Sequence, residues 1–126
     1  MQRPLTEEPT LVEVTYLFSR ECPSHEDGRN LIDAAASAAG VPVAVRVVEV
    51  TSDAQAEDIS FPGSPTYLID GADLAAADPD MPRRIEVCRA YELSDGRIGP
   101  LPELTQLAAA LGEAGARRSP AERIET

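Results

Sequence analysis

The feature that most constrains the fold is a pair of apolar runs joined by a segment with helical spacing. LVEVTYLF over residues 11–18 and VPVAVRVVEV over residues 41–50 are rich in β-branched residues, which is typical of buried strands. A helix that ends at Gly40 is predicted between them, from the spacing of Leu31, Ile32, Ala35, Ala36 and Ala39. Strand, helix and strand in this order predict a right-handed crossover between two parallel strands.

The rest of the chain extends this unit into a small mixed sheet. We expect a short helix with a Ser or Asp cap at 52–59, a strand at 66–69, a long loop at 72–85, a fourth strand at 86–93, a turn at 94–100 and a last helix at 101–114. The order β-α-β-α-β-β-α predicts an α/β fold, with a central mixed four-stranded sheet flanked by helices.

The length and the ends of the chain predict one domain. With 126 residues, the expected core covers residues 11–114, between a flexible lead-in over 1–10 and a flexible charged tail over 115–126. No apolar run approaches the roughly 20 residues of a membrane span, and the N-terminus lacks a secretory signal. We therefore expect a cytoplasmic protein, whose oligomeric state the sequence does not indicate.

The net charge of −11 bears on the partners. Nucleic acids and anionic membranes attract clustered Lys and Arg, so neither is an expected partner. Such acidity mainly favours solubility. Arg83 and Arg84 lie in the predicted loop, where they bind an anion, such as the carboxylate of a small thiol, or are simply solvated.

The residues that indicate chemistry follow the first predicted strand. Cys22 lies where the next helix begins, and a helix N-terminus carries roughly half a positive charge, which lowers the pKa of a cysteine. Pro23 fits the first turn of that helix. His25 lies one helical turn from Cys22, where it stabilises a thiolate or is an ordinary exposed residue. The alternative for Cys22 is a small buried residue.

Three segments together resemble the thioredoxin-like superfamily over roughly residues 11–114: YLFSRECPSH, VPVAVRVVEV and FPGSPTYLIDG. The resemblance implies that Cys22 is the nucleophile, that Pro65 follows a cis peptide bond, and that Pro23, Ser24 and the Ser64 backbone contact a substrate. His25 occupies the position of the usual second cysteine. That departure implies a monothiol mechanism, or a cycle that uses Cys88.

Cys88 has two interpretations. In a plain thioredoxin core it lies at the far end of the last strand, about 17–20 Å from the site, whereas a disulfide needs Cα atoms within about 7 Å. On the other hand, EVCRAYELSDGRIGPLPELTQL resembles the end of the alkylmercury lyase core. That second resemblance implies that Cys88 approaches Cys22 to hold a soft metal or an organomercurial.

The sequence thus favours thiol-disulfide or thiol-adduct chemistry at Cys22, on a small-molecule or protein substrate. A thiol-dependent oxidoreductase and a lyase-like enzyme are both compatible with it. The alternatives are a soft-metal or organomercurial-binding protein that uses Cys22 with Cys88, and a binding or biosynthetic partner without redox chemistry. We expect no cofactor and no resident metal, since one histidine and two cysteines do not complete a zinc site.

Overall fold

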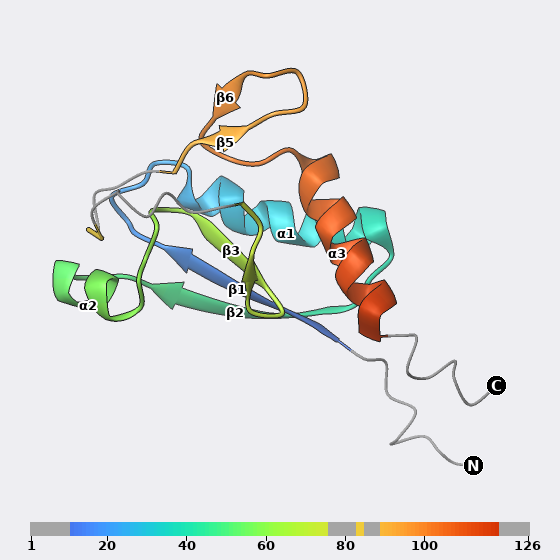
Figure 1. Cartoon of the computed structure of the whole chain (residues 1–126), viewed down its shortest axis with the longest axis horizontal. Coiled ribbons are helices and arrows are strands. Elements are labelled where there is room, and N and C mark those ends of the chain that lie inside the picture. Colours follow the sequence, from blue (N-terminus) through green and yellow to red (C-terminus); the bar gives the residue numbers. More distant parts are fainter. Residues whose placement is uncertain (1–10, 76–82, 85–88, 119–126) are drawn as a thin grey trace, which may run out of the picture.

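The computed structural model describes residues 11–75, 83–84 and 89–118 of the chain. Its elements are β1 (Val12–Phe18), α1 (His25–Ala39), β2 (Val43–Glu49), α2 (Asp53–Asp58), β3 (Thr66–Ile69), β4 (Ala72–Asp73), β5 (Tyr91–Glu92), β6 (Ile98–Gly99) and α3 (Leu104–Arg118). Figure 1 shows strands and helices alternating as far as β3, after which β4, the β5-β6 hairpin and the last helix follow.

Four strands form one mixed sheet in the order β2-β1-β3-β4. β1 and β2 are parallel, with Tyr16 opposite Val47, and β3 is antiparallel to β1, with Tyr16 opposite Tyr67. β4 pairs antiparallel with β3. The predicted α/β class, with a mixed four-stranded sheet flanked by helices, is confirmed, and so is the parallel pairing of the first two strands.

The fourth strand of the sheet is not the predicted one. It is β4, directly after the turn at Asp70 and Gly71, whereas the prediction placed it at residues 86–93. Both turn residues have positive φ, 50° and 88°, as in a two-residue hairpin turn, so the chain reverses at once. Residues 85–88 lie outside the described part. β5 lies within the predicted 86–93 strand, and β6 lies within the predicted 94–100 turn. The two strands pair with each other in a hairpin that is separate from the four-stranded sheet (Figure 1).

Local signals set two of the helix ends as predicted. The Ser52 hydroxyl accepts a hydrogen bond of 3.1 Å from the Gln55 N–H and caps α2. Gly40 ends α1 in the left-handed conformation, with φ of 68°.

Two other helix ends differ from the prediction. α1 begins at His25 after the N-cap Ser24, so Pro23 precedes the helix instead of lying in its first turn. α3 continues to Arg118, past the expected end of the domain at residue 114, because Ala114 is still buried in the core. Residues 1–10 and 119–126 lie outside the described part.

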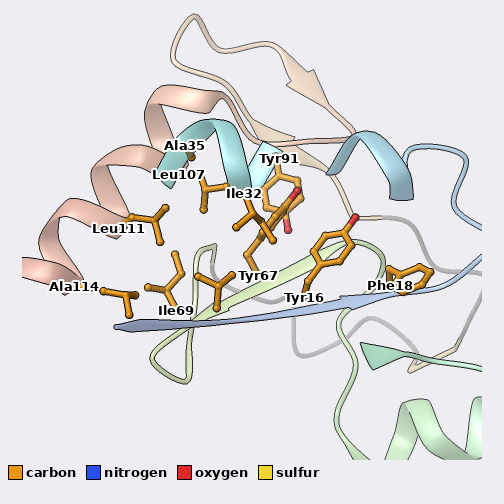
Figure 2. Packing of buried hydrophobic residues seen from close by; sticks show 12 residues of the cluster. Tyr16, Phe18, Ile32, Ala35, Tyr67, Ile69, Tyr91, Leu107, Leu111 and Ala114 are labelled. Atoms are coloured by element: carbon orange, nitrogen blue, oxygen red, sulfur yellow. The ribbon is translucent and has the colours of Figure 1, made fainter. Parts of the chain in front are cut away.

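The main core cluster lies between the sheet and the two long helices, α1 and α3 (Figure 2). Its buried members are Val12, Val14, Tyr16, Phe18, Ile32, Ala35, Tyr67, Ile69, Tyr91, Leu107, Leu111 and Ala114. Leu17 points to the other face of β1 and packs with Val50, Ala56 and Phe61, beside α2. β1 is therefore covered on both faces, and the Cys22 loop leaves from its C-terminal end.

Candidate functional site

Cys22 lies in a tight loop between β1 and α1. Its N–H donates to the Ser19 carbonyl at 3.0 Å, and its own carbonyl accepts from the His25 N–H at 3.3 Å. These bonds fold the loop back on itself, and only 2% of Cys22 is exposed. Cys22 therefore lies in the loop two residues before the N-cap of α1, instead of where the helix begins as predicted, and in the interior of the protein.

The structure brings Cys22 next to the residue before Pro65. The Cys22 thiol donates to the Ser64 carbonyl with an Sγ–O distance of 3.7 Å, and the Ser64–Pro65 peptide bond is cis. The Ser64 hydroxyl accepts from the Ser19 N–H at 3.0 Å, so the two loops are also joined beside the cysteine. Two segments that the sequence analysis singled out separately thus form one site.

The Ser64 carbonyl has a second donor within the protein. The Arg89 N–H donates to it at 2.9 Å, in addition to the Cys22 thiol. Ser64 is 1% exposed, and the Pro65 carbonyl accepts the Tyr91 hydroxyl at 2.5 Å. The backbone that the resemblance assigns to substrate binding is therefore engaged by the protein's own groups in this conformation.

The described ring contact of the His25 side chain is with β1. Its ring stacks on Phe18 with a centroid distance of 5.0 Å and an interplanar angle of 22°. The described hydrogen bonds between His25 and Cys22 use the backbone of both residues, not the imidazole. The role of His25 at the thiol therefore stays a prediction, and the ring contact that the structure describes is with Phe18.

The other predicted site residues are less central. Pro23 is exposed, and Ser24 is half-buried, with its carbonyl accepting the Gly28 N–H at 2.8 Å inside the helix. Cys88 lies outside the described residues. Arg83 is half-buried, Arg84 is exposed, and the buried Nη1 of Arg83 has no hydrogen-bond partner in the described part of the chain.

A buried ion pair beside the site was missed by the sequence analysis. Arg89 Nη1 lies 2.8 and 3.0 Å from the two carboxylate oxygens of Asp73, and Nη2 donates to the Ala75 carbonyl at 3.1 Å. The guanidinium also lies over the Tyr91 ring, 5.3 Å from its centroid. Asp73 lies in β4 and Arg89 lies just before β5, 16 residues later in the chain. They meet only in the folded protein, so no local sequence signal predicts this pair.

Three buried tyrosines were also missed as a group. The hydroxyls of Tyr16 and Tyr67 donate to the first turn of α1, at His25 O (2.6 Å) and Gly28 O (2.8 Å), while Tyr91 reaches Pro65 O. Burial raises the pKa of all three phenols, and the nearby Cys22 is the next largest cause for Tyr16. The rings therefore join the core to both segments of the site.

Gly28 makes this arrangement possible. A Cβ at this position would collide with the Tyr16 hydroxyl and lie 3.0 Å from the Tyr67 hydroxyl and from Leu101 Cδ2. A glycine inside a predicted helix was the available signal, because glycine there lowers helix stability and commonly marks close packing.

Two further properties bear on function. Within residues 11–75, 83–84 and 89–118, no three His, Cys, Asp or Glu side chains are grouped so that they could hold a metal ion. None of the described helices has the length and apolar character needed to cross a membrane.

Comparisons of the chain with protein-family models, curated proteins and solved structures gave no match. The site is therefore interpreted from its own geometry.

Proposed function

We propose that this chain is a thioredoxin-like thiol protein that performs thiol-disulfide exchange through Cys22. The observation that carries the proposal is the contact between the Cys22 thiol and the carbonyl of Ser64, the residue before a cis-proline. This contact joins positions far apart in the sequence, and it puts the most reactive side-chain type of the chain at a junction between two loops.

The topology supports the same proposal. A parallel β1-α1-β2 unit carries the cysteine between its first strand and its helix, and the cis-proline directly precedes β3, antiparallel to β1. α1 and α3 pack against each other over one face of the sheet (Figure 1). We take this arrangement as support for the thioredoxin-like part of the proposal.

The exchange proceeds in two balanced steps. The deprotonated Cys22 sulfur attacks one sulfur of a substrate disulfide, forming a Cys22–substrate disulfide as the substrate's own S–S bond breaks. The departing thiolate takes a proton from water. A second thiol then attacks the mixed disulfide, becomes part of the product disulfide, and returns Cys22 as a thiol.

The burial of Cys22 adds a requirement. The thiol can donate to the Ser64 carbonyl only while it is protonated, so this hydrogen bond breaks before the sulfur acts as a nucleophile. With 2% of the residue exposed, a substrate sulfur also needs a local opening to reach it. We therefore expect an exchange rate that saturates as the disulfide concentration rises.

The experiment uses the symmetrical reagent dipyridyl disulfide as the probe, at pH 7, with the folded protein and the variants Cys22→Ser and Cys88→Ser. Cys88→Ser should release one equivalent of pyridinethione and carry the mixed disulfide on Cys22 by mass spectrometry. Cys22→Ser should remain unmodified while folded. In denaturant each single variant should react fully, which verifies its remaining thiol. A folded Cys88→Ser protein that does not react overturns the proposal.

The wild-type protein then decides how the mixed disulfide is resolved. If Cys88 is the second thiol, two equivalents of pyridinethione leave and one intramolecular disulfide forms. If the mechanism is monothiol, the Cys22 mixed disulfide persists until an external thiol is added. A parallel titration with mercuric ion tests the soft-metal alternative, for which tight binding must be lost in both single variants.

A further inference from the structure

A cleft that is lined by His25 but not by Cys22 is not used by the proposed exchange. Its volume is about 370 Å³, and it opens between the first half of α1 and the exposed Val47 of β2. That volume lies in the range of small-molecule sites. Cys22, Ser64 and Pro65 do not line it, so an inference about this cleft does not depend on the proposed function.

The floor of the cleft is apolar. Tyr16 and Phe18 stack on the same face of β1 with centroids 5.8 Å apart, and Val47 lies opposite Tyr16 in the parallel register. Val47 is 49% exposed, although Val43 and Val45 on the same face of β2 pack against the main core cluster. Val47, on the edge strand β2, is thus the exposed apolar residue of the floor, and Tyr16 and Phe18 are buried.

One wall of the cleft is aromatic. The His25 ring stacks on Phe18, so two parallel rings border the apolar floor. Aromatic and apolar surfaces of this kind favour a flat aromatic ligand, since rings gain from offset stacking beyond simple burial.

The charged side chains at the rim of the cleft favour a ligand of one charge sign. Arg29 lines the cleft, but its guanidinium is already paired with Asp33 at 3.3 Å. Glu26 also lines it, and among the described residues it takes part in no ion pair. The uncompensated rim charge is therefore negative, in a chain whose net charge is −11.

From these observations we propose that the cleft between α1 and β2 binds a small aromatic amine. The ring lies against Val47, Phe18 and His25, and the ammonium group lies at the rim beside Glu26.

The experiment compares three ligands that share one ring and differ in charge: naphthylmethylamine, naphthylmethanol and naphthoate. Binding is followed by ligand fluorescence anisotropy and by the methyl NMR signals of the protein. The amine should bind about two- to fivefold more tightly than the alcohol, as expected for one exposed ion pair, and naphthoate should bind most weakly. The Val47 methyl signals should shift more than those of Ile59, an exposed apolar residue outside the cleft.

Two pairs of variants test the position of the ligand. Glu26→Gln should remove the preference for the amine over the alcohol, whereas Glu57→Gln, which removes an exposed carboxylate on α2, should keep it. Val47→Ser should weaken all three ligands about fivefold, and Ile59→Ser should not. Equal affinity for the amine and the alcohol, or equal effects of the two members of either pair, overturns the proposal. Exchange at Cys22 is measured in the same variants and should be unchanged.

Discussion

The two ends of the main core cluster are built from different chemistry. At one end lie Ile69, Leu111 and Ala114, with no polar side-chain atom, and at the other lie Phe18 and the rings of Tyr16, Tyr67 and Tyr91 (Figure 2). We name these the aliphatic end and the tyrosine end. Every hydroxyl of the tyrosine end donates to a backbone carbonyl of α1 or of Pro65. The tyrosine end therefore holds the site as well as filling the core.

The difference between the ends should be largest at high pH. The chain has three tyrosines, all at the tyrosine end, and its sequence contains no lysine to titrate in the same range. Burial raises the pKa of each phenol, so the folded state keeps them protonated while the unfolded chain ionises at about pH 10. Stability is thus fully present below pH 10 and falls above it, by about 1.4 kcal/mol per tyrosine per pH unit.

At pH 11 the three tyrosines together should lower the free energy of unfolding by about 4 kcal/mol. Urea unfolding at pH 8 and pH 11 measures the loss. Phenolate absorption should appear only as the protein unfolds. A phenolate signal that develops at pH 10 while the circular dichroism stays native would contradict the buried, hydrogen-bonded tyrosine end.

A substitution at the aliphatic end should have the next largest effect. Leu111 is fully buried, so Leu111→Ala removes apolar contacts and leaves a cavity, at a cost of about 3 kcal/mol. Leu104→Ala, in the same helix but 37% exposed, is the matched control and should cost less than about 1 kcal/mol. Both are measured by urea unfolding at pH 7. Equal losses would mean that α3 does not seal the aliphatic end as described.

A single methyl group should disturb the tyrosine end by about 2 kcal/mol. In Gly28→Ala the added Cβ displaces the Tyr16 and Tyr67 hydroxyls, and this overpacking outweighs the gain of about 1 kcal/mol in helix propensity. Gly112→Ala in α3 is the control, since no atom lies within 4 Å of its added Cβ. That variant should raise stability by up to about 1 kcal/mol. Thermal unfolding of the two variants should therefore shift in opposite directions.

The two ends also differ in how far the sequence predicts them. The aliphatic end needs only apolar residues at the right period, and Leu107 and Leu111 have the helical spacing that puts them on one face of α3. Cys22 and the cis bond at Pro65 were found from a local motif and a resemblance. The hydrogen bonds of the tyrosines and the Arg89–Asp73 ion pair join segments that are distant in the sequence. They were not predicted, because periodicity shows which face of an element a residue lies on but not which residue it contacts there.

The position of β4 shows a different kind of failure. Asp70-Gly71 is a common hairpin-turn sequence, yet residues 72–85 were predicted to form a loop. A two-residue turn with positive φ returns the chain to its neighbour immediately, so local pairing with β3 precedes any pairing with a later strand. The Asp-Gly turn therefore indicates a hairpin between β3 and β4, which makes β4 the fourth strand of the sheet.

The smallest expected effect isolates one hydroxyl of the tyrosine end. Tyr16→Phe keeps the ring but removes the donor to the His25 carbonyl, which still accepts a helical N–H, so the cost should be about 1 kcal/mol. The informative measurement is the double variant with Gly28→Ala. Phenylalanine lacks the oxygen that the added Cβ would meet, so Gly28→Ala should cost about 1 kcal/mol less in this background than in the wild type. Strictly additive losses in urea unfolding would mean that the hydroxyl does not rest against Gly28. The tyrosine end would then act as apolar filling, like the aliphatic end, and would not hold the start of α1 beside Cys22.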